Sequence, residues 1–90
     1  MSEPGYTASP DVVSREVAGE AVLLNLESGL YFGLNEVGSA IWQALDEGSH
    51  TLNSLCDLVE DRFDAPRSVI EGDVETLLRA LEAHDLVTKT

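Results

Sequence analysis

The chain has 90 residues, of which 43% are apolar and 24% charged, and its formal net charge is −12. This composition predicts one folded domain, and a domain of this size buries only about two-thirds of its unfolded surface. Nucleic acids and anionic membranes are both bound mainly through Lys and Arg, so 5 basic against 17 acidic residues disfavour both, and we expect neither as a partner. A partner that carries Lys or Arg would be attracted instead.

The sequence contains neither a pair of cysteines nor a targeting signal. Cys56 is the single cysteine, so no intrachain disulfide can form and no cysteine cluster can bind a metal. Its place in an apolar helix pattern predicts a buried free thiol. The N-terminus has no signal-peptide pattern, and no apolar run approaches the ~18 residues of a membrane helix. We therefore expect a cytoplasmic protein.

The first part of the chain reads as a tail and three strands. Residues 1–10 hold two of the three prolines together with Gly and Ser, which predicts a flexible tail. Residues 11–88 are the expected domain. Val12–Val17 and Ala21–Leu26 are predicted as strands around a turn at Gly19, the second with Val22, Leu24 and Leu26 on one face and Leu23 facing outward.

The third predicted strand leads directly into a helix. In Leu30–Leu34 the residues Leu30, Phe32 and Leu34 alternate with Tyr31 and Gly33, which predicts one core-facing side. Gly29, which tolerates a positive φ, predicts a hairpin turn before it. Asn35 is a favourable N-cap for a helix over Glu36–Glu47 that ends at Gly48.

Two further helices complete the predicted fold. Thr51 can cap a helix from Leu52 to about Phe63, and Ser68 or Pro66 opens a longer one that reaches about His84. The expected fold class is α+β, winged-helix-like, with an N-terminal three-stranded antiparallel sheet followed by three helices. The exposed face of the last helix is acidic, so it would repel DNA.

No catalytic or cofactor-binding pattern occurs. His50 and His84 begin no metal-ligand spacing, the acidic i, i+4 pairs fit a solvated helix face, and no glycine-rich phosphate loop is present. We therefore expect no catalytic residues, no metal and no cofactor, and we interpret the chain as a binding module.

The binding feature is a predicted strand edge. Leu30–Leu34 contains no Lys or Pro, the residues that commonly protect an edge. Such an edge can accept an extended peptide by β-augmentation. On a helical wheel, the last helix gathers mostly small residues on one side, which suggests the floor of a groove; these are Val69, Gly72, Asp73, Thr76, Leu77 and Ala80. The alternative is that Gly72 and Ala80 only allow close packing on the sheet.

The segment YFGLNEVGSAIW, together with the D-V-x-x-L-L-x-x-L pattern of the last helix, resembles the PqqD-like family of peptide chaperones, also called RiPP recognition elements. The likeness is strongest to the stand-alone leader-binding proteins of lasso-peptide biosynthesis. It implies that a precursor's leader peptide adds to the third strand, lies against the third helix and is delivered to a leader peptidase or another modification enzyme. The residues that the resemblance implicates are Leu30, Tyr31, Phe32, Gly33, Leu34, Val69, Ile70, Asp73, Val74 and Leu77.

Three other interpretations compete with this one. A chaperone of the same family could present its precursor to a radical SAM enzyme or another modifying enzyme. A helix-turn-helix transcription factor would need affinity for DNA, which the charge opposes. A structural or dimerisation module would show a concentration-dependent mass without affinity for peptides.

Overall fold

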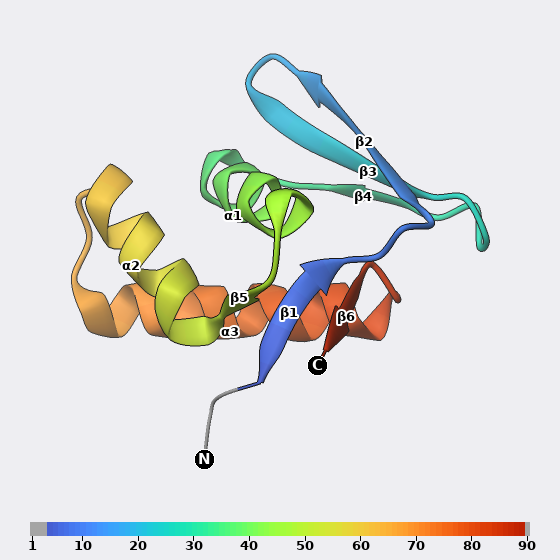
Figure 1. Cartoon of the computed structure of the whole chain (residues 1–90). Coiled ribbons are helices and arrows are strands. Elements are labelled where there is room, and N and C mark those ends of the chain that lie inside the picture. The colour runs from blue at the N-terminus through green and yellow to red at the C-terminus, as the bar shows by residue number, and fades with distance from the viewer. Residues whose placement is uncertain (1–3, 90) are drawn as a thin grey trace.

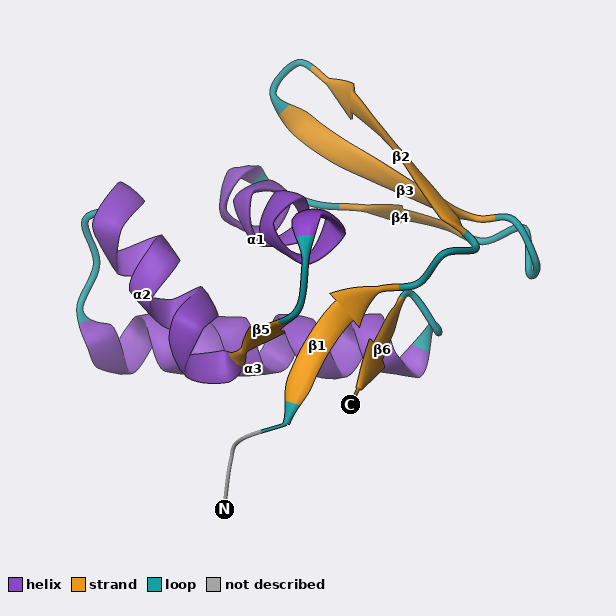
Figure 2. Cartoon of the chain, viewed as in Figure 1, coloured by secondary structure: helices purple, strands orange, loops and turns teal. Residues whose placement is uncertain are grey.

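The computed structural model describes residues 4–89, which form three helices and two small antiparallel sheets (Figures 1 and 2). The strand orders are β2-β3-β4 and β5-β1-β6. The predicted α+β fold, a three-stranded sheet followed by three helices, is confirmed. The elements are β1 (Gly5–Ala8), β2 (Val12–Val17), β3 (Glu20–Asn25), β4 (Tyr31–Gly33), α1 (Glu36–Glu47), β5 (His50–Thr51), α2 (Leu52–Arg62), α3 (Arg67–Ala83) and β6 (Val87–Lys89).

The β2-β3-β4 sheet projects above α1 as a wing (Figure 1). Its β2–β3 hairpin closes through Ala18 and Gly19, whose φ angles are 53° and 84°. Two consecutive positive φ values match the right-handed twist of the strands they join. Gly29, with a φ of 77°, adopts the predicted positive value in the β3–β4 connection. The sheet therefore has the predicted strand order, with β4 at one edge.

The N-terminal segment differs from the prediction. Gly5–Ala8, expected within a flexible tail, form β1 and pair with β5 on one side and β6 on the other. The tail prediction is therefore wrong for these residues, while residues 1–3 lie outside the described part. Strand partners from residues 50–51 and 87–89 order this segment, and local Pro and Gly content carries no information about them.

The predicted inward face of β3 is also wrong. Ala21 and Leu23 are buried, whereas Leu26 is 62% exposed. Residues on both faces of β3 are apolar, so alternation alone cannot show which face meets the helices. Leu30 likewise lies outside the core with 51% of its surface exposed, whereas Leu34 is buried as predicted.

Helix α1 has the predicted bounds. The Asn35 side chain accepts a hydrogen bond from the Gly38 N–H at 2.8 Å. A Cβ on Gly38 would lie 3.3 Å from the Leu34 side chain, so the strand and the helix meet closely here. The Ser39 hydroxyl accepts a hydrogen bond of 2.7 Å from the Ala21 N–H, which ties α1 to β3.

Helices α2 and α3 match their predictions within a residue or two. Thr51 and Ser54 form a capping box at the start of α2. Arg67 of α3 joins the two helices through ion pairs with Asp57 at 2.7 Å and Glu60 at 3.6 Å of α2, and it also pairs with Glu71 of its own helix. The hydrogen bond to Asp57 is the main cause that raises the pKa of Arg67. Cys56 is buried, as predicted. The core consists mainly of Leu23, Ile41, Trp42, Leu45, Leu55, Val59, Ile70, Val74, Leu78, Leu81 and Leu86.

Candidate functional site

The open edge of β4 is the first component of the candidate site. The Leu34 N–H donates to the Ala21 carbonyl at 2.8 Å, and the Asn25 N–H donates to the Leu30 carbonyl at 3.0 Å. Main-chain groups alternate in direction along an antiparallel strand. The N–H and C=O groups of Tyr31 and Gly33 therefore point away from β3, toward the edge at which the sheet ends.

A groove beside this edge is the second component. One wall comes from the start of α1 and the residue before it, and the other from the middle of α3; the enclosed volume is about 420 Å³. The lining residues are Asn35, Val37, Gly38, Ile41, Asp73, Thr76, Leu77 and Ala80. Most of them are apolar or small, so the groove suits the side chains of an extended peptide better than a strongly charged ligand.

The buried residue Asn25 positions the wing relative to α3. Its side-chain oxygen accepts hydrogen bonds from the N–H groups of Glu27 at 2.9 Å and Ser28 at 3.2 Å. Its side-chain nitrogen donates to the His84 carbonyl at 3.4 Å. The His84 ring also lies 5.5 Å from the ring of Phe32, measured between centroids. These contacts fix the β3–β4 connection and β4 at the C-terminal end of α3.

The predicted edge residues all lie on or next to β4. Leu34 is buried and Phe32 is half-buried, so these two side chains join the edge to the core. Tyr31 is 75% exposed and Leu30 51% exposed. Gly33 is exposed, and a Cβ there would meet no atom within 4 Å. The free space beside Gly33 lets another chain approach its main chain closely.

The predicted residues of α3 lie in three different environments. Asp73 and Leu77 line the groove, and Val69 is 50% exposed one turn earlier but lies outside the lining. Ile70 and Val74 are 2% and 0% exposed and belong to the core. The expectation that these two side chains face the groove is therefore wrong, because the helical repeat places them on the buried side of α3 with Leu78 and Leu81.

The α1 wall and Asn25 were not predicted as parts of the site. The wheel of the last helix did indicate Thr76 and Ala80, but Val37, Gly38 and Ile41 were assigned only to the helix that follows the strand. For Asn25, the signal is an Asn that ends an apolar strand in the sequence Asn-Leu-Glu-Ser-Gly, the pattern of a side-chain-capped turn.

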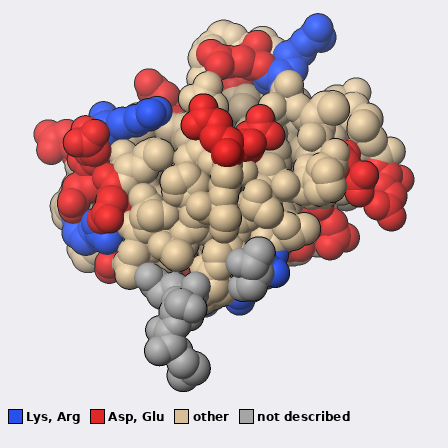
Figure 3. Space-filling model, viewed as in Figure 1, with Lys and Arg blue, Asp and Glu red and all other residues tan. Residues whose placement is uncertain are grey.

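Charge in the groove comes from Asp73 alone among its lining residues. Acidic residues are spread over the visible surface and do not gather in one patch (Figure 3).

Within residues 4–89, no group of three or more His, Cys, Asp or Glu is placed to hold a metal ion. No helix in that range is long and apolar enough to cross a membrane.

Comparisons with known proteins give the family and the fold of the chain. Residues 20–87 match the family model described as coenzyme PQQ synthesis protein D (PqqD). The solved structure of "TbiB1 in Complex with the TbiA(beta) Leader Peptide" has 38% sequence identity and a TM-score of 0.81, over 90% of this chain and 93% of that chain.

A second solved structure is similar in fold. "Lasso peptide synthetase B1 complexed with the leader peptide" has 23% identity and a TM-score of 0.78, over 92% of this chain and 96% of that chain. No curated protein sequence matches the chain significantly.

Proposed function

Because the chain belongs to the PqqD family, we propose that it binds the leader peptide of a ribosomally made precursor. The observation that carries this proposal is the open β4 edge beside a groove of α3. TbiB1, which is 38% identical over nearly the whole chain, is solved with a leader peptide. This likeness supports a peptide as the occupant of the edge and groove.

The leader adds as a fourth strand next to β4. Its main chain pairs with the edge-facing N–H and C=O groups of Tyr31 and Gly33, and this pairing is largely independent of the leader's sequence. Residues opposite one another in a sheet point to the same face. Leader side chains opposite Phe32 and Leu34 therefore point toward α3 and enter the groove.

The groove selects the chemistry of those side chains. Leu77, Ala80 and Val37 favour an apolar or aromatic anchor, because burial of apolar surface contributes about 25 cal/mol per Å². Asp73 favours a basic or hydroxyl group beside that anchor. The net charge of −12 attracts a leader that contains Lys or Arg.

The role is non-catalytic: the chain holds the leader and delivers the precursor to a leader peptidase in lasso-peptide biosynthesis. This setting is supported by two similar structures together, since TbiB1 is solved with a leader peptide and the second, also solved with a leader peptide, is a lasso peptide synthetase B1. The PqqD family description supports a second candidate, in which the same groove presents a precursor to a radical SAM or other modifying enzyme. The genes that neighbour this chain distinguish the two, because a transglutaminase-like peptidase points to a lasso system.

Titration of a fluorescently labelled leader tests the proposal. The first probe is the TbiA(beta) leader peptide, followed by the leader of a small open reading frame beside this gene. We expect saturable one-to-one binding in fluorescence anisotropy, and no saturation with a scrambled peptide of equal charge. Equal binding of the scrambled peptide, or no binding of either leader, would contradict the proposal.

A further inference from the structure

The outer face of the wing is unusually apolar for a solvent-exposed surface. Cross-strand pairing places Val13 with Leu24, Arg15 with Val22 and Val17 with Glu20 on the side away from the helices. Val13 and Val17 are 48% and 55% exposed. We use "outer face" for Val13, Arg15, Val17, Val22, Leu24 and Tyr31. Together with Ser14, they line a shallow hollow of about 380 Å³.

The pattern of β2 is the reverse of that expected for a sheet with one solvated side. Its residues on the helix side, Ser14 and Glu16, are polar, whereas Val13 and Val17 point outward. In an antiparallel sheet with one solvated face, the outward residues are polar. Strand β3 is apolar on both sides, the pattern of a strand that is covered on both faces. The chain itself covers only one of them.

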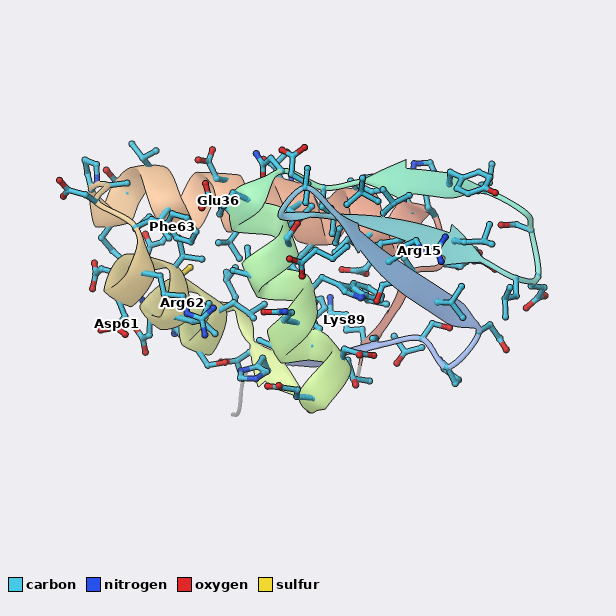
Figure 4. All side chains as sticks on the ribbon, turned by 90° about the horizontal axis from the view of Figure 1, so that it is seen from above. Arg15, Glu36, Asp61, Arg62, Phe63 and Lys89 are labelled. Atoms are coloured by element: carbon cyan, nitrogen blue, oxygen red, sulfur yellow. The ribbon has the colours of Figure 1, made fainter. Side chains whose placement is uncertain are left out.

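Arg15 lies within this apolar hollow without an acidic partner. Arg67 pairs with Asp57, Glu60 and Glu71, and Arg79 pairs with Glu75, but no carboxylate among residues 4–89 lies within ion-pair distance of Arg15. Seen from above, Arg15 lies on the wing, at the opposite end of the molecule from Asp61 (Figure 4). An unpaired Arg surrounded by apolar side chains is a typical anchor of a protein interface.

We infer that the outer face is the docking surface for the enzyme that receives the leader, and that the enzyme contributes an apolar surface with a carboxylate for Arg15. A second copy of this chain fits poorly, because a two-fold contact centred on this face would bring the two Arg15 side chains together and join two charges of −12. The charge also opposes an anionic membrane.

The position of the face relative to the leader supports this partner. The inference rests on the proposed function in one respect: an added leader strand lies beside β4, so its outward side chains continue the outer face past Tyr31. An enzyme on this face would contact the chain and the presented leader together. Its affinity for the leader-bound protein should therefore exceed its affinity for the free protein.

The experiment measures two affinities for each variant of the full chain. The first probe is the labelled leader, and the second is the purified peptidase or modifying enzyme encoded beside this gene. Arg15→Glu reverses the anchor charge, and Val13→Thr with Val17→Thr makes the face polar at constant shape. Arg79→Glu, on α3, is the control with the same change in net charge.

We expect Arg15→Glu to weaken enzyme binding at least tenfold and the double Thr variant several-fold. Leader affinity should stay within twofold in both, and Arg79→Glu should change neither affinity. Unchanged enzyme binding in both outer-face variants, or an equal loss with Arg79→Glu, overturns the inference while the proposed function stands. Sedimentation of wild type as a dimer that Val13→Thr with Val17→Thr dissociates also overturns it. Failure of the wild type to bind any leader contradicts the proposed function instead.

Discussion

The two edges of the wing differ in what lies beside them. Strand β2 offers the longer edge, six residues against three in β4. The Leu26 N–H donates to the Asp11 carbonyl, so the main chain of Ser14 and Glu16 faces the open side of β2. The lining of the groove formed with α3 contains no residue of either strand, but it begins at Asn35, two residues after the end of β4.

This difference shows that unpaired backbone groups are not sufficient to make a binding site. Arg15 and Glu16 lie in β2, and charged residues in an edge strand discourage pairing with another chain. Strand β4 has no charged residue, and its Phe32 lies against His84 at the C-terminal end of α3. We therefore expect the leader to select β4, and the following changes test that choice.

The largest expected effect is on leader affinity, from a proline at each edge. Gly33→Pro removes an edge-facing N–H and places a ring where the leader approaches. We expect a loss of about 2 kcal/mol, roughly 30-fold in Kd. Ser14→Pro removes the equivalent N–H from the β2 edge and should change the affinity less than about twofold. Fluorescence anisotropy measures both, and thermal unfolding confirms that each variant is folded.

A larger loss of leader affinity in Ser14→Pro than in Gly33→Pro would place the leader on β2. Equal weakening by both prolines would indicate a general disturbance of the wing. Gly33→Ala separates the two effects of the β4 variant, because it keeps the N–H and adds only a methyl group in free space. We expect this variant to bind the leader more tightly than Gly33→Pro does.

Asn25→Ala tests the connection that holds β4 beside α3. The change leaves the N–H groups of Glu27 and Ser28 without their acceptor and removes the bond to the His84 carbonyl. We expect unfolding to become easier by about 2 kcal/mol. Asn35→Ala, which removes the N-cap of α1, should cost about 1 kcal/mol. Urea denaturation followed by the fluorescence of Trp42, the single tryptophan, gives both values.

The free energy of unfolding of Asn25→Ala shows whether the Asn25 side chain links the wing to α3. A change similar to that of Asn35→Ala would show that the side chain is not an important link between wing and helix. A large loss of stability with unchanged leader affinity, measured under folding conditions, would show that β4 keeps its place beside α3 through other contacts.

Local sequence patterns predicted the helices and the strand order but not the orientation of the sheet. The Asn35 cap and Gly48 predicted α1 with its observed bounds, because capping chemistry depends only on neighbouring residues. The face of β3 was predicted wrongly, since Leu23 and Leu24 are equally apolar and only α1 decides which of them is buried. Strand β1 was missed because its partners lie about 45 and 80 residues further along the chain.

Of the candidate site, local patterns predicted the strand edge and one side of α3 but not the wall formed by α1. The edge followed from the third strand, and one side of α3 followed from helical periodicity. Ile70 and Val74 were placed in the groove by the family resemblance, although their periodicity is that of the core stripe. The α1 wall depends on the angle at which α1 leaves β4, and no single residue encodes that angle.

A smaller effect is expected from the charge in the groove. Asp73→Asn keeps the size of the side chain but removes the carboxylate that we assign to a basic group of the leader. We expect affinity to fall about fivefold, close to 1 kcal/mol. Glu82→Gln makes the same change in charge outside the groove lining and should have an effect below twofold. Equal effects at both positions would mean that only the overall charge attracts the leader.

The smallest expected effect is a gain in stability at Gly72. This residue lies in α3, is exposed, and leaves open space where a Cβ would be, so the alternative that it permits close packing on the sheet is wrong. Gly72→Ala should stabilise the protein by about 0.5–1 kcal/mol through helix propensity, measured by urea denaturation with Trp42 as the probe. Leader affinity should stay within twofold, because the α3 wall of the groove begins at Asp73. A clear loss of affinity in a stabilised variant would extend the leader's path along α3 toward its N-terminus and widen the difference between the β4 side and the β2 side of the wing.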